Sequence, residues 1–267
     1  MGLKSGYWED LATSDLGSLD PEAVIALLPV GATEQHGPHL PLSTDSVINR
    51  GIVERALARV PEDLILLVLP ALPVGDSAEH GDFPGTLSLP AELLIGLWTG
   101  IGASVARAGL RKLVIFNSHG GQTQVVDIVA QRLRMEFGML VVRATYFNFG
   151  TPDGLFGAEE LAHGIHGGAA ETSMMLALKP ELVRKDEAAD FRPLSLDMVG
   201  GYEILRPEGP AGFAWASQDL HPSGAAGDAT QADPDKGRKL LDHAAERLVA
   251  VLRDLRRAPL SLLRKRD

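Results

Sequence analysis

Four short apolar runs divide the first half of the chain, and each is bounded by proline, glycine or polar residues. They are Ala23–Val30, Leu64–Leu69, Lys112–Phe116 and Leu140–Ala144. Apolar runs of roughly four to eight residues with such boundaries are typical of strands buried on both faces. We therefore predict four buried strands.

Between and after these runs, apolar residues recur with a helical period. We predict helices over Asp45–Val60, Ala91–Ala108, Gln122–Phe137, Ala169–Leu178 and Pro234–Leu255, the last one amphipathic. Ser43 or Thr44 is the expected cap of the first helix, and Pro61 ends it. Alternating strands and helices predict a layered α/β/α fold with a mostly parallel central sheet.

The rest of the chain shows no clear period. We expect residues 1–20 to form an irregular lead-in, residues 146–162 to be loop-rich and the basic tail Arg256–Asp267 to lie at the surface. Residues 190–232 are rich in Gly, Pro and Asp, and such long stretches are usually functional or lie at subunit contacts. Without a repeat or a low-complexity linker, we predict one domain over 1–267, with its core at about 22–180.

Composition narrows the possible functions. The 267 residues are 45% hydrophobic, and 25 basic against 35 acidic residues give a net charge of −10. This charge argues against nucleic acid or an anionic membrane as the main partner, since both need a basic surface. The absence of cysteine excludes disulfides, thiolate ligands and a cysteine nucleophile. With no leader and no apolar run of about 18 residues, we expect a soluble cytoplasmic protein.

Three loops that follow the predicted strands are rich in chemistry-bearing side chains. The first holds Glu34, His36, His39 and Asp45; the second holds Asp76, Glu79, His80 and Asp82; the third is Asn117-Ser118-His119-Gly120-Gly121. In parallel sheets, ligands bind beyond the carboxyl ends of the strands. We therefore expect all three loops to meet at one rim and form an active site.

Imidazole and carboxylate groups gathered at one rim are typical of a metal centre. The predicted ligands are Glu34, His36, Asp45, His119 and Glu171. This donor set suits Zn, Mn or Fe better than Ca or Mg. Five ligands exceed what one open catalytic site needs, so two metals bridged by Asp45 are plausible. The alternative for the first loop is a solvated turn with polar side chains.

The remaining histidines have less specific surroundings. His166 precedes a helix, and is either a general acid or base or a histidine that caps the helix or supports the ligands of the site. We interpret His80 as supporting the site or facing the substrate. Together with Glu171, these two histidines are the candidate catalytic residues. We expect His39 to be held by local hydrogen bonds, and assign structural roles to His163, His221 and His243, the last on the exposed face of its helix.

The glycines after the third strand have an alternative function. The stretch Ser118–Gln122, SHGGQ, joins a strand to a helix and could hold a phosphate group. It lacks the G-x-G-x-x-G spacing and the P-loop lysine, so a nucleotide-binding module is a weak alternative. No G-x-S-x-G elbow marks a serine nucleophile.

Four motifs, in order and spacing, resemble the creatininase (creatinine amidohydrolase) family. They are PVGATEQHGPHLPLSTD, EHGDFPGTLSL, FNSHGGQ and HGGAAETS, and HPSGAAGDATQADPDKG at 221–237 is a weaker match. The resemblance implies a layered α/β fold, one or two divalent metals per subunit (Zn, Mn or Fe), and hydrolysis of a non-peptide amide C–N bond. It also implies a homo-oligomer, often a hexamer, that acts on a small-molecule amide.

Carried over residue by residue, the resemblance implies the roles of individual side chains. Glu34, His36, Asp45 and His119 match family metal ligands, with Asp45 as the bridge, and His166 matches a catalytic histidine. Glu171 is either a ligand or a residue that supports one.

Two positions depart from the creatinine-hydrolysing members. Gly121 stands where they have a ligand glutamate, so the second metal would need Glu171 or be weakly held. Ala162 stands where they have a substrate-covering tryptophan. Other branches of the family include a formamide-cleaving enzyme and a peptidase of redox-cofactor maturation. We therefore expect a metal-dependent amidohydrolase, with a formamide deformylase or small peptidase as the alternative. A non-catalytic, metal-stabilised oligomeric scaffold is the alternative from a different class.

Overall fold

A computed structural model describes residues 4–17 and 19–264. Residues 1–3 and 18 of the expected lead-in, and 265–267 of the expected basic tail, lie outside the described residues. Within the described part, no helix is long and apolar enough to cross a membrane.

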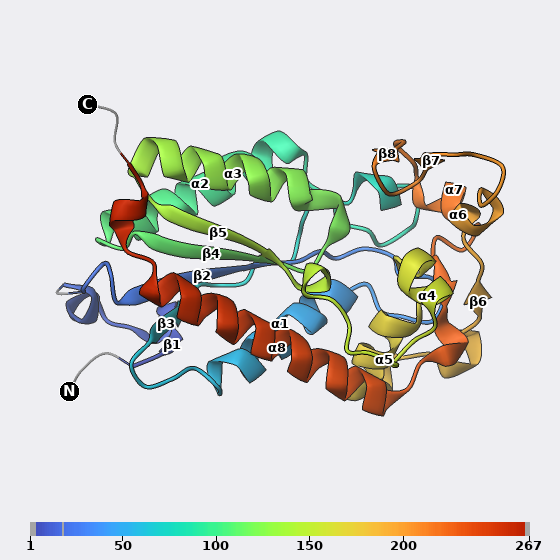
Figure 1. The fold of residues 1–267 in the computed structure, drawn as a ribbon, viewed down its shortest axis with the longest axis horizontal. Helices are drawn as coiled ribbons and strands as arrows, with labels where there is room; N and C mark the ends of the chain where they lie inside the picture. The colour runs from blue at the N-terminus through green and yellow to red at the C-terminus, as the bar shows by residue number, and fades with distance from the viewer. Residues whose placement is uncertain (1–3, 18, 265–267) are drawn as a thin grey trace.

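A five-stranded parallel sheet forms the centre of the molecule (Figure 1). Its strands are β1 (Gly6–Tyr7), β2 (Val24–Val30), β3 (Ile65–Val68), β4 (Lys112–Asn117) and β5 (Leu140–Thr145), in the order β1-β3-β2-β4-β5. The register places Ile25 opposite Leu66 on one side and Lys112 on the other. The four predicted strands are confirmed. The irregular lead-in was wrong at β1, because a two-residue strand carries no periodic signal.

Helices cover both faces of the sheet, which confirms the predicted layered α/β class (Figure 1). One face carries α2 (Ala91–Arg107) and α3 (Thr123–Phe137), and the other carries α1 (Thr44–Leu57), α5 (Ala169–Leu178) and α8 (Pro234–Arg257). Side chains of β2 alternate between the two layers: Ile25 and Leu27 pack towards α1 and α8, whereas Ala26 and Leu28 pack towards α2 and α3. The all-apolar sequence of β2 follows from this burial on both faces.

The start of α1 differs from its prediction. Ser43 is the N-cap residue, but its side chain caps no backbone N–H, and the Thr44 hydroxyl donates to the Pro41 carbonyl at 2.7 Å. The helix also ends at Leu57 rather than Val60. Its first turn thus places Asp45 at the rim through the tight loop before it, without a side-chain cap.

A smaller lobe beside the carboxyl end of the sheet holds the short elements (Figure 1). These are α4 (Ala158–His163), α6 (Leu194–Asp197), α7 (Ser217–Leu220), β6 (Asp190–Phe191) paired with β9 (Gly227–Asp228), and β7 (Leu205–Arg206) paired with β8 (Ala211–Gly212). The sequence predicted loops here, and α4 was missed because six residues give less than two helical turns.

A buried carboxylate joins this lobe to the main body. Glu160 on α4 accepts hydrogen bonds from the backbone N–H of Ala169 (2.7 Å), at the start of α5, and of Asp228 (2.8 Å) on β9. A side chain at Gly164, Gly168 or Gly227 would meet the Glu160 carboxylate. The glycines let three segments close around one charged group, which stabilises the N-terminus of α5.

Candidate metal centre

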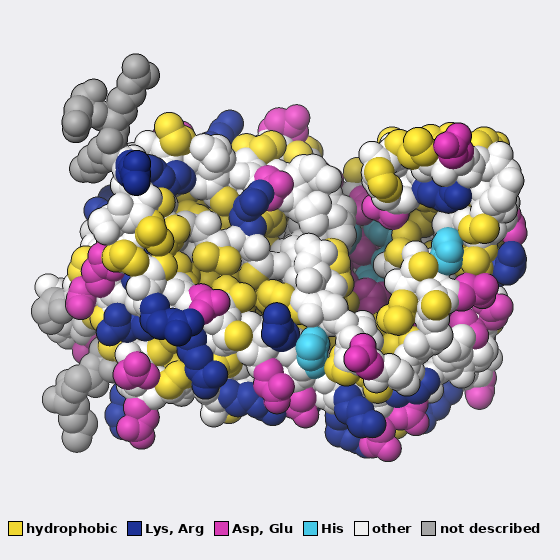
Figure 2. Space-filling view, in the orientation of Figure 1, with side chains coloured by type: hydrophobic (Ala, Val, Ile, Leu, Met, Phe, Trp, Pro, Cys, Tyr) yellow, Lys and Arg dark blue, Asp and Glu magenta, His cyan; other side chains and the backbone are white. Residues whose placement is uncertain are grey.

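Three chain segments bring the predicted ligands to one rim of the sheet. Glu34 and His36 lie in the loop after β2, Asp45 lies in the first turn of α1, and His119 follows β4. Glu171 comes from the first turn of α5. Figure 2 shows a recess between the main body and the small lobe, with Asp, Glu and His side chains at its floor.

Two histidines turn a bare ring nitrogen towards the carboxylates. His36 donates its Nδ1–H to the Glu34 carbonyl at 3.1 Å, so its Nε2 lone pair lies 3.2 Å from Asp45 Oδ1. His119 donates its Nε2–H to the Asp76 carbonyl at 2.7 Å, so its Nδ1 lone pair lies 3.3 Å from Asp45 Oδ2. Since a carbonyl can only accept, it fixes each tautomer. A lone pair facing a carboxylate requires a cation or a proton between them.

The side chains form three groups whose candidate ligand atoms lie within 4.8 Å of one another. These are Glu34–Asp45–His119, His36–Asp45–Glu171 and Glu34–His36–His166. Asp45 belongs to the first two groups through its two oxygens. The arrangement thus offers two neighbouring positions for a cation with Asp45 between them.

Unsatisfied buried oxygens fit the same arrangement. Among the described residues, Glu34 Oε1 and Oε2 and Asp45 Oδ2 have no hydrogen-bond donor, although both residues are 2% exposed or less. His119 Nδ1 lies 3.2 Å from Glu34 Oε1, but without the geometry of a hydrogen bond. Burying carboxylate oxygens without a partner costs stability unless a cation is bound. The donor set therefore fits a divalent metal of the Zn, Mn or Fe type.

The charges of these groups depend on one another. Burial lowers the pKa of His36, but the Asp45 carboxylate outweighs this and raises the pKa to about 10. Burial likewise opposes protonation of His119, and the Glu34 carboxylate raises its pKa well above the ordinary value. Burial raises the pKa of Glu171 to about 7. Without a metal, protons occupy the positions that the carboxylates offer, so metal and proton compete for this site.

His166 and His80 stand beside the ligand groups. Their rings are stacked, with centroids 4.3 Å apart, and His166 also lies 4.1 Å from the His36 ring. His166 donates its Nε2–H to the Gln35 carbonyl at 2.7 Å, which leaves the Nδ1 lone pair 3.9 Å from Glu34 Oε1. Burial and the neighbouring histidines keep the pKa of His166 well below its ordinary value. Within the part of the chain that the structure describes, the hydrogen-bond contacts of its ring are both to Gln35 and none is to the N-terminus of α5, so it does not serve as a helix cap.

Gln35, which the sequence did not single out, links the loops of the site. Its Nε2 lies 2.6 Å from His80 Nδ1 and donates to the Gly224 carbonyl at 2.9 Å. The contact with Gln35 uses His80 Nδ1, and the other ring nitrogen, Nε2, lies 3.4 Å from Glu34 Oε1. Burial lowers the pKa of His80 to about 4, so its imidazole is neutral near pH 7. Tyr146 was also missed; burial and the Glu171 carboxylate raise its pKa.

Two of the other histidines lie in surroundings that differ from the prediction. His39 was expected to make local hydrogen bonds, but its Nε2 contacts the Thr172 hydroxyl on α5 at 2.9 Å. His243 was expected on the exposed face of α8, but it is half-buried and lies 3.2 Å from the Phe149 carbonyl. Both histidines tie α5 or α8 to segments that are distant in sequence, which helical spacing cannot predict.

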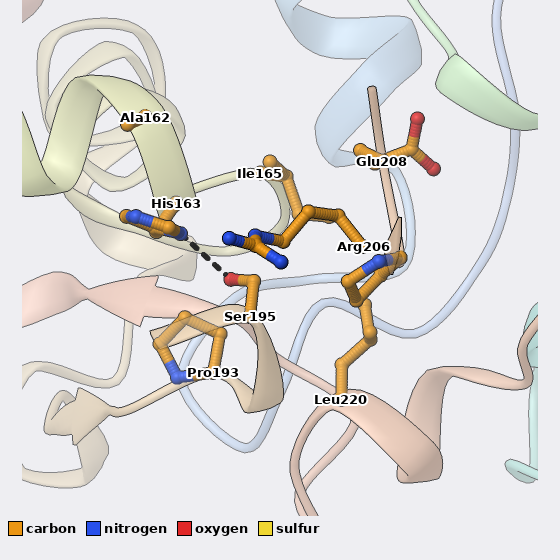
Figure 3. A pocket seen from close by; sticks show the side chains of 9 residues that line it. Ala162, His163, Ile165, Pro193, Ser195, Arg206, Glu208 and Leu220 are labelled. Atoms are coloured by element: carbon orange, nitrogen blue, oxygen red, sulfur yellow. Dashed lines mark hydrogen bonds between the residues drawn. The ribbon is translucent and has the colours of Figure 1, made fainter. Parts of the chain in front are cut away.

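A separate cavity of about 180 Å³ lies in the small lobe (Figure 3). Ala162 lines it together with His163, Ser195 and Arg206, and His163 Nδ1 lies 2.9 Å from the Ser195 hydroxyl. None of the clustered carboxylates or imidazoles lines this cavity. The metal-type chemistry therefore lies in the recess, and His163 links α4 to α6.

Comparisons with known proteins agree with this geometry. The family model described as creatinine amidohydrolase matches residues 9–252. The chain is 32% identical over 238 residues to the mycofactocin precursor peptide peptidase of Mycobacterium ulcerans, covering 86% of this chain and 85% of the relative. It is 28% identical over 252 residues to the creatinine amidohydrolase of Pseudomonas putida, covering 86% and 89%.

A solved structure named "Creatininase Mn" superimposes with a TM-score of 0.75 at 27% identity, covering 94% of this chain and 98% of that one. The match of the family model over nearly the whole chain establishes the relationship. The chain belongs to the creatininase family and is a metal-dependent hydrolase of amide C–N bonds.

Proposed function

We propose that the recess holds two divalent cations of Zn, Mn or Fe and hydrolyses the C–N bond of a small-molecule amide, such as a cyclic amide. Glu34, Asp45 and His119 would hold one cation, and His36, Asp45 and Glu171 the other. The observation that carries the proposal is the pair of bare histidine nitrogens facing buried carboxylates. A structural site would be closed by its ligands, whereas this one opens into the recess of Figure 2.

The chemistry divides between the cations and the side chains. Bound divalent cations would supply a water whose pKa is lowered to about 7, and positive charge beside the substrate carbonyl. His166 Nδ1 can accept a proton at the edge of the recess and return it to the leaving nitrogen. The Gln35 carbonyl holds the tautomer that this role requires, since it accepts from His166 Nε2. His80 stacks on His166 and limits its ring to one orientation.

The decisive experiment is metal analysis of protein purified without chelator, followed by turnover assays. We expect close to two equivalents of Zn, Mn or Fe per chain, because the two groups proposed to hold the cations, Glu34–Asp45–His119 and His36–Asp45–Glu171, share only Asp45. One equivalent would mean that Glu171 does not replace the carboxylate missing at Gly121. No bound metal after reconstitution would contradict the proposal and leave a scaffold role.

A peptidase is the second candidate, and two observations favour it. Ala162 lines a cavity in the lobe rather than placing a large ring over a substrate, and relatives at 31–34% identity are named mycofactocin precursor peptide peptidase. Assays with creatinine, a formamide and a short modified peptide would separate the candidates. Turnover of the peptide alone would replace the cyclic-amide assignment; a formamide deformylase would cleave only the second substrate.

We also propose a homo-oligomer, with a hexamer as the form that the family resemblance suggests, working in the cytoplasm. Exposed apolar side chains on α2, Leu93 (60% exposed) and Leu97 (47%), offer a surface for association. Light scattering at micromolar protein concentration tests this directly. A monomer at that concentration would contradict the oligomer.

A further inference from the structure

A fourth carboxylate, Glu79, lies next to the candidate centre but outside its ligand groups. It lies in the 3-10 turn Ala78–His80, and its side chain is 17% exposed. Its Oε1 lies 3.6 Å from His119 Nε2 and 3.8 Å from His80 Nε2. Glu79 therefore faces the edge of the His119 ring that points away from Glu34 and Asp45.

The missing side chain at Gly121 makes room for this carboxylate. A Cβ atom built at residue 121 would overlap the Glu79 carboxylate and would lie 2.8 Å from His119 Nε2. At the neighbouring Gly120, a Cβ would meet nothing within 4 Å. Neither glycine has the positive backbone φ that favours glycine, so space rather than backbone conformation distinguishes them. The place of Glu79 beside His119 thus depends on glycine at 121.

We propose that Glu79 is a positioning residue for His119. Its carboxylate supplies a negative charge beside the His119 ring, which residue 121 cannot supply because it is glycine. The inference rests on the proposed metal centre. The Asp76 carbonyl already fixes the His119 tautomer at 2.7 Å. What Glu79 adds is charge on the same edge of the ring, which makes Nδ1 a stronger donor to a cation.

The first test uses Glu79→Gln, which removes the charge and keeps the shape. We expect Zn²⁺ affinity, measured by competition with a chelator, to fall by roughly 10- to 100-fold. With Co²⁺ as a probe, the visible absorption bands should shift, since they report the surroundings of the ion directly. Thermal unfolding of the metal-free variant shows whether folding is retained. Unchanged affinity and bands would overturn the inference.

The second test exploits the space at 121. Gly121→Ala should displace Glu79 and lower Zn²⁺ affinity to a similar extent, whereas the control Gly120→Ala should bind like the wild type. The double variant Glu79→Gln/Gly121→Ala should bind no more weakly than the weaker single variant, because both act on one carboxylate. Losses that multiply would show that Gly121 acts by another route and would overturn the inference.

The two levels of proposal fail differently. If the wild-type protein binds no Zn²⁺ or Co²⁺, the proposed metal centre itself fails. If the wild type binds both ions and Glu79→Gln binds them equally well, only the role of Glu79 fails.

Discussion

The two ends of strand β4 both bury charge, but in opposite ways. At its start, the Lys112 ammonium lies 3.0 Å from the Glu22 carboxylate and donates to the Glu22 and Arg256 carbonyls at 3.0 and 3.4 Å. Beyond its end, both carboxylate oxygens of Glu34 and Oδ2 of Asp45 have no hydrogen-bond donor among the described residues. A charge with all its partners in place holds the fold together, whereas carboxylates left without donors are arranged for something that binds.

Replacing Asp45, which both candidate cations would share, should have the largest effect on bound metal and turnover. Asp45→Asn removes a charge that both candidate cations use, so bound metal should fall towards zero and turnover with it. Elemental analysis and an activity assay measure this side by side. The control is Asp219→Asn, a carboxylate that accepts a hydrogen bond from the Ala216 N–H at the start of α7. Full metal content in Asp45→Asn would remove Asp45 from the centre.

The proposed proton carrier should give the next largest effect. His166→Ala should keep its metal but lower kcat by about 10²–10⁴-fold, since it removes a general acid or base and leaves Asp45 in place. His163→Ala, in the lobe, is the matched histidine control. Loss of metal in His166→Ala would instead favour the third ligand group, in which His166 Nδ1 joins Glu34 and His36.

At the other end of β4, the expected effect concerns folding alone. Lys112→Ala should lower the free energy of unfolding by about 2–3 kcal/mol, because it removes a fully buried side chain and leaves a cavity. The Glu22 carboxylate is 44% exposed, so the loss of its partner adds little. Arg143→Ala, from an exposed ion pair with Asp127, should cost about 0–1 kcal/mol. Denaturant titration gives both values. A change in metal content in Lys112→Ala would mean that the two ends are coupled.

The pH dependence of the metal-free protein should give the most gradual effect. Because the folded state raises the pKa of His36 to about 10, it binds more protons than the unfolded state between about pH 6.5 and 10. The contribution of His36 to the free energy of unfolding should therefore be fully present below about pH 6.5. It should fall as pH rises, by at most about 1.4 kcal/mol per pH unit for one such group. Metal-loaded protein should lack this slope, because the cation replaces the proton. Equal slopes with and without metal would contradict the competition.

The elements and the rim could be predicted from the sequence because local signals specify them. Apolar runs bounded by glycine or polar residues mark β2 and β4, and a parallel sheet brings their carboxyl ends together. The contacts that complete the site have no such signal. The link from His39 to Thr172 spans 133 residues, and Glu79 reaches His119 only because residue 121 lacks a side chain. Such contacts depend on how separate elements pack.

The Glu160 carboxylate explains why glycines surround His166 in the sequence. Positions 164 and 168 require glycine because Glu160 and β9 pack directly against them, and this requirement is independent of any reaction at the site. A relative that had lost its metal would still need these glycines to hold α4, α5 and β9 together. These glycines around His166 in another sequence therefore indicate a shared fold. Deciding whether such a relative is still an enzyme requires inspection of Glu34, Asp45 and His119.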